Sequence, residues 1–165
     1  MHTRLVKPRH GPELLVRPLT SGDVETVTGV FARLGERSRR ARFMGPKPCI
    51  SAAELEQLAT VDARRHALVG YVHGDPEPAA IASLVRNDRD SAEIAFAVAD
   101  EYQHRGIGSA LAAELLADAR AAGIIEITAL ASSDNPAAVA LLRRISNVLD
   151  VQLEGPELSI RAAIA

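Results

Sequence analysis

The segment from residue 92 to residue 130 places the strongest limit on how this 165-residue chain folds. Residues 92–98 alternate like a strand, residues 106–122 carry apolar side chains at helical spacing, and residues 124–130 are typical of a buried strand. A helix that joins two strands of one sheet is a crossover, and a crossover makes the two strands parallel. The sequence therefore predicts one parallel pair inside the sheet that the rest of the chain builds.

The remaining elements are joined by short turns, which favour antiparallel neighbours. Further strands are expected at residues 14–19, 67–72, 79–85, 148–153 and 158–163. We predict an α/β fold with a mixed sheet of about seven strands, mostly antiparallel around a central parallel pair, and about four helices on both faces. Residues 1–12 lack periodicity and are expected to form a flexible tail before a single domain over residues 13–165.

Composition narrows the classes of function. Aromatic residues make up 3% of the chain and the net charge is −2, which argues against a nucleic-acid-binding protein. Cys49 is the only cysteine, and no metal-ligand spacing of His or Cys occurs, so neither a disulfide nor a metal site is predicted. No segment has the apolar run of a signal peptide or a membrane span, so we expect a cytoplasmic protein without membrane contact.

The charge is unevenly distributed along the chain. Residues 1–49 hold 10 Lys/Arg and 4 Asp/Glu, a net of +6, and much of the excess lies in residues 33–47. Three interpretations stay open at this point: a solvated surface, a contact for an acidic partner, or a contact for cofactor phosphates.

The loop between the first strand and the long helix is Gln103-His104-Arg105-Gly106-Ile107-Gly108-Ser109. Two glycines at a strand-to-helix junction leave the first amides of the helix uncovered, and the positive end of the helix dipole adds to them. Such a junction favours phosphate binding. A dinucleotide fingerprint would need a third glycine in phase, and a P-loop would need a lysine, so the loop fits neither class.

The spacing Gln103-x-x-Gly106-x-Gly108 resembles the signature of the GCN5-related N-acetyltransferase (GNAT) family, and the later run from Asn135 to Leu142 is similar to that family's second cofactor segment. The resemblance extends over residues 13–163. It implies acetyl-CoA as co-substrate. The cofactor-binding residues implied are Phe96, Ala97, Val98, Gln103, His104, Arg105, Gly106, Ile107, Gly108, Ser109 and Asn135.

Within the family, two segments are most similar to the catalytic domain of bacterial protein-lysine acetyltransferases. They cover residues 36–44 and residues 51–55. The resemblance therefore implies an N-acetyltransferase that acts on a primary amine, either of a small molecule or of a protein lysine. Members of the family often dimerise, which leaves a homodimer open. The sequence determines neither the acceptor nor the preferred acyl chain.

Glu93 is the predicted general base. It begins an otherwise apolar strand and shares one face with Ala95 and Ala97. A carboxylate facing a cleft there would be partly desolvated, which makes it a stronger base. The alternative is a Glu in water or paired with Arg86. The resemblance also implies an oxyanion donor at the N–H of Ala97 or Val98.

The predicted site departs from the family pattern at the step that releases the thiolate. Where many members have a Tyr that acts as general acid, this chain has Leu142, and Ser146-Asn147 replaces the usual Gly-Phe. Ser132 and Ser133 are the candidate substitutes. A non-catalytic acetyl-CoA-binding sensor is therefore the alternative to an enzyme.

Overall fold

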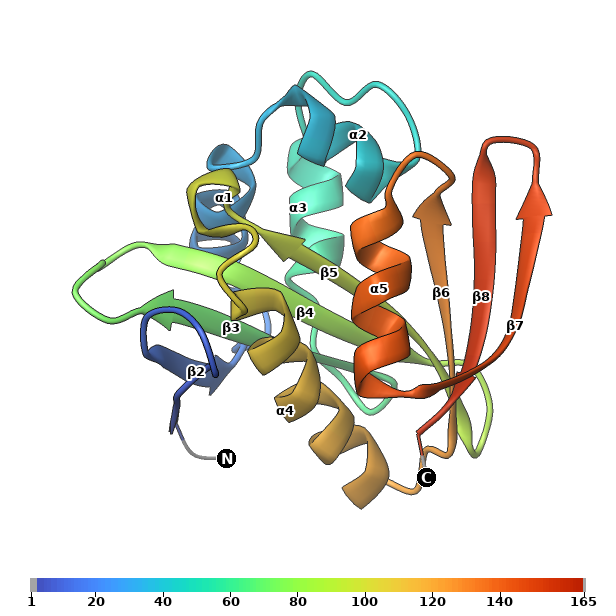
Figure 1. Cartoon of the computed structure of the whole chain (residues 1–165). Helices are drawn as coiled ribbons and strands as arrows, with labels where there is room; N and C mark the ends of the chain where they lie inside the picture. Colours follow the sequence, from blue (N-terminus) through green and yellow to red (C-terminus); the bar gives the residue numbers. More distant parts are fainter. Residues whose placement is uncertain (1–2, 165) are drawn as a thin grey trace.

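The computed structural model of the protein describes residues 3–164. Within that range the chain forms one eight-stranded sheet in the order β1-β2-β3-β4-β5-β6-β8-β7, with helices on both faces (Figure 1). The strands are β1 (Arg4–Val6), β2 (Leu14–Pro18), β3 (Arg65–Val72), β4 (Pro78–Arg86), β5 (Ser91–Val98), β6 (Glu126–Ser132), β7 (Asn147–Glu154) and β8 (Glu157–Ala163). The predicted mixed α/β architecture is confirmed.

The helices of the described range are α1 (Val24–Ala32), α2 (Glu36–Phe43), α3 (Ala52–Leu58), α4 (Ile107–Ala121) and α5 (Pro136–Ile145), with a short 3₁₀ turn, η1 (Asp100–Tyr102). Local signals set several of their ends. Ser51 and Glu54 form the reciprocal capping box that opens α3. Asn135 caps α5 and Pro136 occupies its first turn. None of these helices is both long and apolar enough to cross a membrane.

The predicted parallel pair is the contact between β5 and β6, and every other neighbouring pair is antiparallel. Helix α4 makes the crossover between the two parallel strands (Figure 1). The structure has one strand and one helix more than the sequence predicted. The extra strand is β1, and the extra helix is α2.

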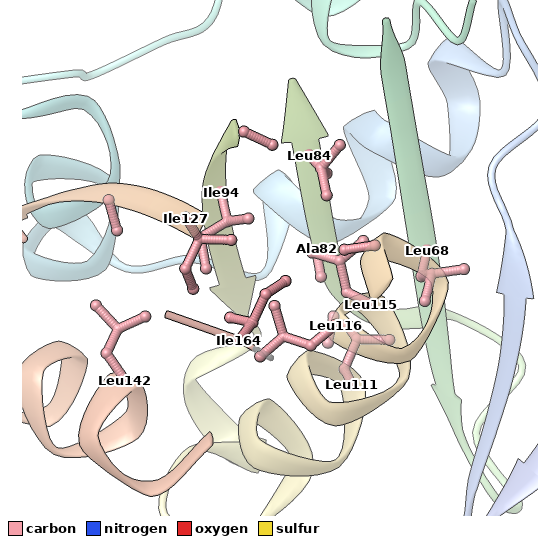
Figure 2. Packing of buried hydrophobic residues seen from close by; sticks show 14 of the residues in the cluster. Leu68, Ala82, Leu84, Ile94, Leu111, Leu115, Leu116, Ile127, Leu142 and Ile164 are labelled. Atoms are coloured by element: carbon pink, nitrogen blue, oxygen red, sulfur yellow. The ribbon is translucent and has the colours of Figure 1, made fainter. Parts of the chain in front are cut away.

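Two apolar cores lie on opposite faces of the sheet. The larger joins α4 and α5 to the sheet, with Leu111, Leu115 and Leu116 of α4 packed against Leu68, Ala82 and Ile94 of the strands (Figure 2). The smaller lies under α1 and includes Val27, Val30 and Phe31. Strand β5 serves both, because Ile94 faces the larger core and Ala97 the smaller one.

Residues 4–6 were expected to lie in a flexible tail, but the structure places them in strand β1. Leu5 is opposite Leu15 of β2 in an antiparallel ladder. Arg4 donates to Glu114 at 2.7 Å and to Asp118 at 2.6 Å, both on α4. The α4 residues that hold this segment are more than 100 positions away along the chain, so no local pattern could reveal these ion pairs.

Candidate active site

The parallel strands β5 and β6 part soon after they begin. Their ladder runs from the Ser91–Glu126 pair to the Glu93–Thr128 pair, although β5 continues to Val98 and β6 to Ser132. Figure 1 shows the two strands diverging beyond their shared end. The backbone of β5 from Ile94 onward thus has a strand partner, β4, on one side only. Its open edge can accept an extended ligand as an added strand.

The N–H groups of β5 decide between the two expected oxyanion donors. Ala99 N donates to Ala79 O of the β4 side at 2.7 Å. Because successive N–H groups of a strand point to opposite sides, the N–H of Ala97 also points toward β4, opposite Ile81. The N–H of Val98 then points toward the open edge. Of the two residues, only Val98 can offer a free main-chain donor to a ligand lying there.

The glycine loop follows β5 directly and leads into α4. Gly106 is the N-cap of α4 in the left-handed region, with φ of 77°, and no side chain caps the helix. His104 also has a positive φ, 59°. Alternating left-handed residues in a loop turn successive N–H groups to one side, which makes a cradle for anions. The first N–H groups of α4, at Ile107, Gly108 and Ser109, have no intrahelical partner. This geometry fits the phosphates of a nucleotide cofactor.

Gln103 ties the loop to its surroundings. Its Nε2 lies 3.1 Å from Val98 O, 3.0 Å from Ser38 Oγ of α2 and 3.2 Å from Asp100 Oδ1. The side chain therefore links the end of β5, the start of η1 and helix α2. It holds the loop in register with the open edge of β5.

The N-terminal segment packs against the back of the loop. Gly11 has φ of +127°, and a Cβ on it would lie 2.1 Å from Arg105 O. A Cβ on Gly106 would lie 2.8 Å from His10 O and 3.3 Å from Pro8 Cβ. Pro8 is buried. The backbone of the N-terminal segment and the backbone of the loop therefore approach closely. At both positions a side chain would not fit, so both contacts require glycine.

An ion-pair cluster around Arg33 fixes η1 from the other side. Arg33 lies 2.7 Å from Asp75 of the β3–β4 turn and also pairs with Glu101. Burial opposes the charge of Arg33, but the hydrogen bonds to Glu101 and Asp75 outweigh it and raise the pKa of the guanidinium. The Arg33 hydrogen bond, with others from the Glu77 backbone and the Tyr102 hydroxyl, lowers the pKa of Asp75 to about 2.

Glu93 lies where β5 and β6 part, on the face that α2 covers. Its side chain is exposed, whereas partial desolvation was expected. The alternative partner Arg86 donates instead to Arg89 O and Ala122 O. Across this face lies Arg42 of α2: burial lowers the pKa of its guanidinium, and the nearby charge of the Glu93 carboxylate opposes this in part.

Leu142 stands at the position of the family's tyrosine, and the candidate substitutes are Ser132 and Ser133. Leu142 is buried in the larger core, where it points from α5 toward the sheet (Figure 2). Tyr71 accepts a hydrogen bond from Arg17, and the Tyr102 hydroxyl donates to Asp75. Ser132 donates to Asp134 at 2.5 Å, and Ser133 is exposed. Of the two candidate substitutes, Ser132 is thus held by its neighbour, whereas the Ser133 side chain is exposed.

Asn135 has a structural role whatever else it does. Its side-chain oxygen accepts a hydrogen bond from Ala138 N at 3.3 Å, which caps α5. Arg144 of the same helix donates to Ser109 Oγ at 3.4 Å, so α5 reaches the start of α4. Residues 3–164 contain no cluster of three or more His, Cys, Asp or Glu side chains that could hold a metal ion.

Sequence reasoning missed three contributors to this site: Gly11, Arg33 and Arg42. Gly11 stood in the expected tail, and the two arginines were counted only as part of a basic segment. Their partners, Arg105, Asp75 and Glu93, are 42 or more positions away along the chain. A glycine between His10 and Pro12 was the only local signal, and it does not identify a partner.

Comparison with known proteins gives one family. The model of the acetyltransferase (GNAT) family matches residues 36–146. The sequence is 33% identical over 147 residues to Acetyltransferase Pat of Mycolicibacterium smegmatis, across 87% of this chain and 44% of that protein. It is 30% identical over 131 residues to Acetyltransferase PA5475 of Pseudomonas aeruginosa, across 77% of this chain and 70% of that protein. The chain thus spans less than half the length of Pat.

The fold agrees with the sequence matches. The solved GNAT domain of S. lividans PAT superposes with a TM-score of 0.85 at 25% identity, and the match covers 98% of this chain and 96% of that one. The matched family region contains the parting strands, the glycine loop and all of α5. The chain therefore belongs to the GNAT family of acetyltransferases.

Proposed function

We propose that the protein transfers the acetyl group of acetyl-CoA directly to a primary amine, with a protein lysine among the acceptors. One observation carries the proposal: the open edge of β5 is followed, after η1 and the glycine loop, by the uncovered amides of α4. The pantetheine arm would lie along residues 96–98 as an added strand, with its hydrogen bonds to Phe96 and Val98, because the N–H of Ala97 points toward β4. Its diphosphate would lie on the loop from Gln103 to Ser109.

Glu93 is the proposed general base. A lysine amine has a pKa near 10.4, so about one in a thousand is neutral at pH 7. Glu93 would take the ammonium proton directly or through a water, since it is accessible to both. The neutral nitrogen then attacks the thioester carbon, and the Val98 N–H stabilises the oxyanion. The carbon–sulfur bond breaks, coenzyme A leaves as a thiolate, and the nitrogen of the new amide gives its second proton to water.

Departure of the thiolate does not require an acid from the protein. Thiols have pKa values near 8.5, so a thiolate is a tolerable leaving group at neutral pH and takes its proton from water. The burial of Leu142 and the engaged hydroxyls of Tyr71 and Tyr102 fit such a route. The same facts favour the second candidate function, an acetyl-CoA sensor without turnover.

Two measurements separate these functions. Calorimetry with acetyl-CoA tests the cofactor site, and thioester consumption with a panel of amines and lysine peptides tests turnover. Binding without turnover would support the sensor, and the absence of both would overturn the proposal.

The variant Glu93→Gln tests the base. General base catalysis contributes about a hundredfold to ten-thousandfold, so kcat should fall by that amount while acetyl-CoA affinity stays unchanged. Glu126→Gln is the matched control, because Glu126 lies on the neighbouring strand and pairs with Arg161. Unchanged turnover in Glu93→Gln would show that the base is another group.

A further inference from the structure

Helix α2 is strongly positively charged, although it packs against the sheet. Its sequence, ERSRRARF, has four arginines in eight residues, and none of its residues is fully buried. It nevertheless packs against β5 and β6, the two strands that part after Glu93. Its one aromatic side chain, Phe43, packs against the smaller core, with its ring centroid 5.4 Å from that of Phe31. The rest of the helix is mostly charged and covers little core.

Arg42 is the residue of α2 that faces this place. Its Nε is buried and has no hydrogen-bond partner within residues 3–164. Burial lowers the pKa of its guanidinium, and the sole opposing influence is the charge of Glu93, with no hydrogen bond between them. Buried polar groups are almost always paired, so an unpaired guanidinium nitrogen points to a missing partner.

The other charged groups around it differ from Arg42 in their partners. On the same face, Arg161 of β8 pairs with Glu126 of β6. Arg39 of α2 donates from Nη1 to Pro48 O at 2.9 Å, although its Nε, like that of Arg42, is buried without a hydrogen-bond partner. Glu93 and Arg42 are thus a negative and a positive group that lie near one another without forming an ion pair.

We propose that Arg42 binds a carboxylate of the acyl acceptor while Glu93 receives its amine, so that the enzyme selects amines with a nearby carboxylate. The inference rests on the proposed function, because it assigns the acceptor of the same site. A guanidinium and a carboxylate are matched in geometry, and the pair is strong where water is excluded. The carboxylate can come from a free amino acid or from an acidic residue beside a lysine.

Paired acceptors test the proposal and distinguish these two sources. One arm uses ω-amino acids of increasing length, each compared with its carboxamide. The other uses lysine peptides that carry Asp or Asn next to the lysine. A charged hydrogen bond corresponds to about tenfold to a hundredfold in kcat/KM. In at least one arm, the acceptor with the carboxylate should therefore have a kcat/KM higher by that factor than its uncharged counterpart.

Variants of α2 assign the preference to one side chain. Arg42→Gln should bring the ratio of the two kcat/KM values close to one by raising KM for the carboxylate acceptor, and Arg42→Lys should retain part of the ratio. Arg40→Gln removes the same charge from an exposed position of the same helix and should leave the ratio unchanged. Far-ultraviolet circular dichroism checks that each variant is folded.

Three results would overturn the proposal: equal kcat/KM values within every pair for the wild-type protein, an unchanged ratio in Arg42→Gln, or an equal loss for both members of a pair. An equal loss for both members would mean that Arg42 affects Glu93 and does not bind the acceptor. No turnover with any amine would instead refute the proposed function itself. In that case, binding of hexanoate but not hexanamide, lost in Arg42→Gln, would still show a carboxylate site.

Discussion

Helix α4 and helix α2 both lie against β5, yet α4 buries six side chains and α2 buries none. The start of α4 is held by the core below it, by Gly11 behind it and by the Arg33 cluster beside it. Helix α2 holds arginines whose Nε atoms are buried without partners. The side proposed to bind the cofactor is thus held by contacts within the protein, whereas the side proposed to bind the acceptor contains buried nitrogen atoms without hydrogen-bond partners.

The difference predicts where substitutions cost stability. Leu115→Ala removes a fully buried side chain of α4 and should lower the free energy of unfolding by about 2–5 kcal/mol. Arg37→Ala, on the exposed face of α2, should change it by less than about 0.5 kcal/mol. Urea unfolding followed by circular dichroism measures both. Equal losses would mean that α2 is as much a part of the core as α4.

A substitution behind the loop tests whether the cofactor side is preformed. Gly11→Ala places a methyl group 2.1 Å from Arg105 O, and a backbone atom can avoid it only by moving. We expect acetyl-CoA affinity to fall by about tenfold, since a displaced loop loses part of its contacts to the phosphates. Calorimetry with acetyl-CoA measures this affinity.

Gly22→Ala is the control for Gly11→Ala. Gly22 also has a positive φ, 84°, but nothing lies within 4 Å of its Cβ position. That variant should cost stability through backbone strain alone and bind acetyl-CoA normally. If both variants bind alike, the N-terminal segment does not shape the loop.

The ion-pair cluster around Arg33 connects the chain before helix α2 to η1, which precedes the glycine loop. The pH dependence of unfolding should reveal how much this cluster contributes to stability. The pKa of Asp75 lies at about 2 in the folded protein, below its usual 3.8, so Asp75 stabilises the fold above pH 4 and loses this effect as the pH falls toward 2. Asp75→Asn should lower the free energy of unfolding by about 1 kcal/mol at pH 7, with allowance for partial exposure. Urea unfolding across this range should show the difference from wild type narrowing below pH 4. A constant difference would assign the loss to packing.

Much of the cofactor side could be predicted from the sequence because it is local. The strand at residues 91–98, the loop and the helix at residues 107–121 follow one another, and periodicity and glycine placement identify each of them. The cap at Asn135 is local in the same way. The matched family confirms the identification of the GNAT fold.

The acceptor side could not be predicted in this way. The exposed Glu93 was expected to be partly buried, and Arg42 was one of several arginines in a basic run. The contacts that give these residues their environment connect α2 to β5 and β6. Local sequence patterns do not state which helix covers which strands, because that choice depends on how all the apolar faces are buried together.

The sequence by itself determined the family, the parallel crossover and the loop with its uncovered amides, since each depends on neighbouring residues and their intrinsic conformational preferences. The tertiary structure alone decided that β5 and β6 part after Glu93, that Gly11 supports Arg105, and that the half-buried Arg42 lies near the Glu93 carboxylate without a hydrogen bond to it. These features arise from packing between distant segments, where burial sets the strength of each charge and the space available to each side chain.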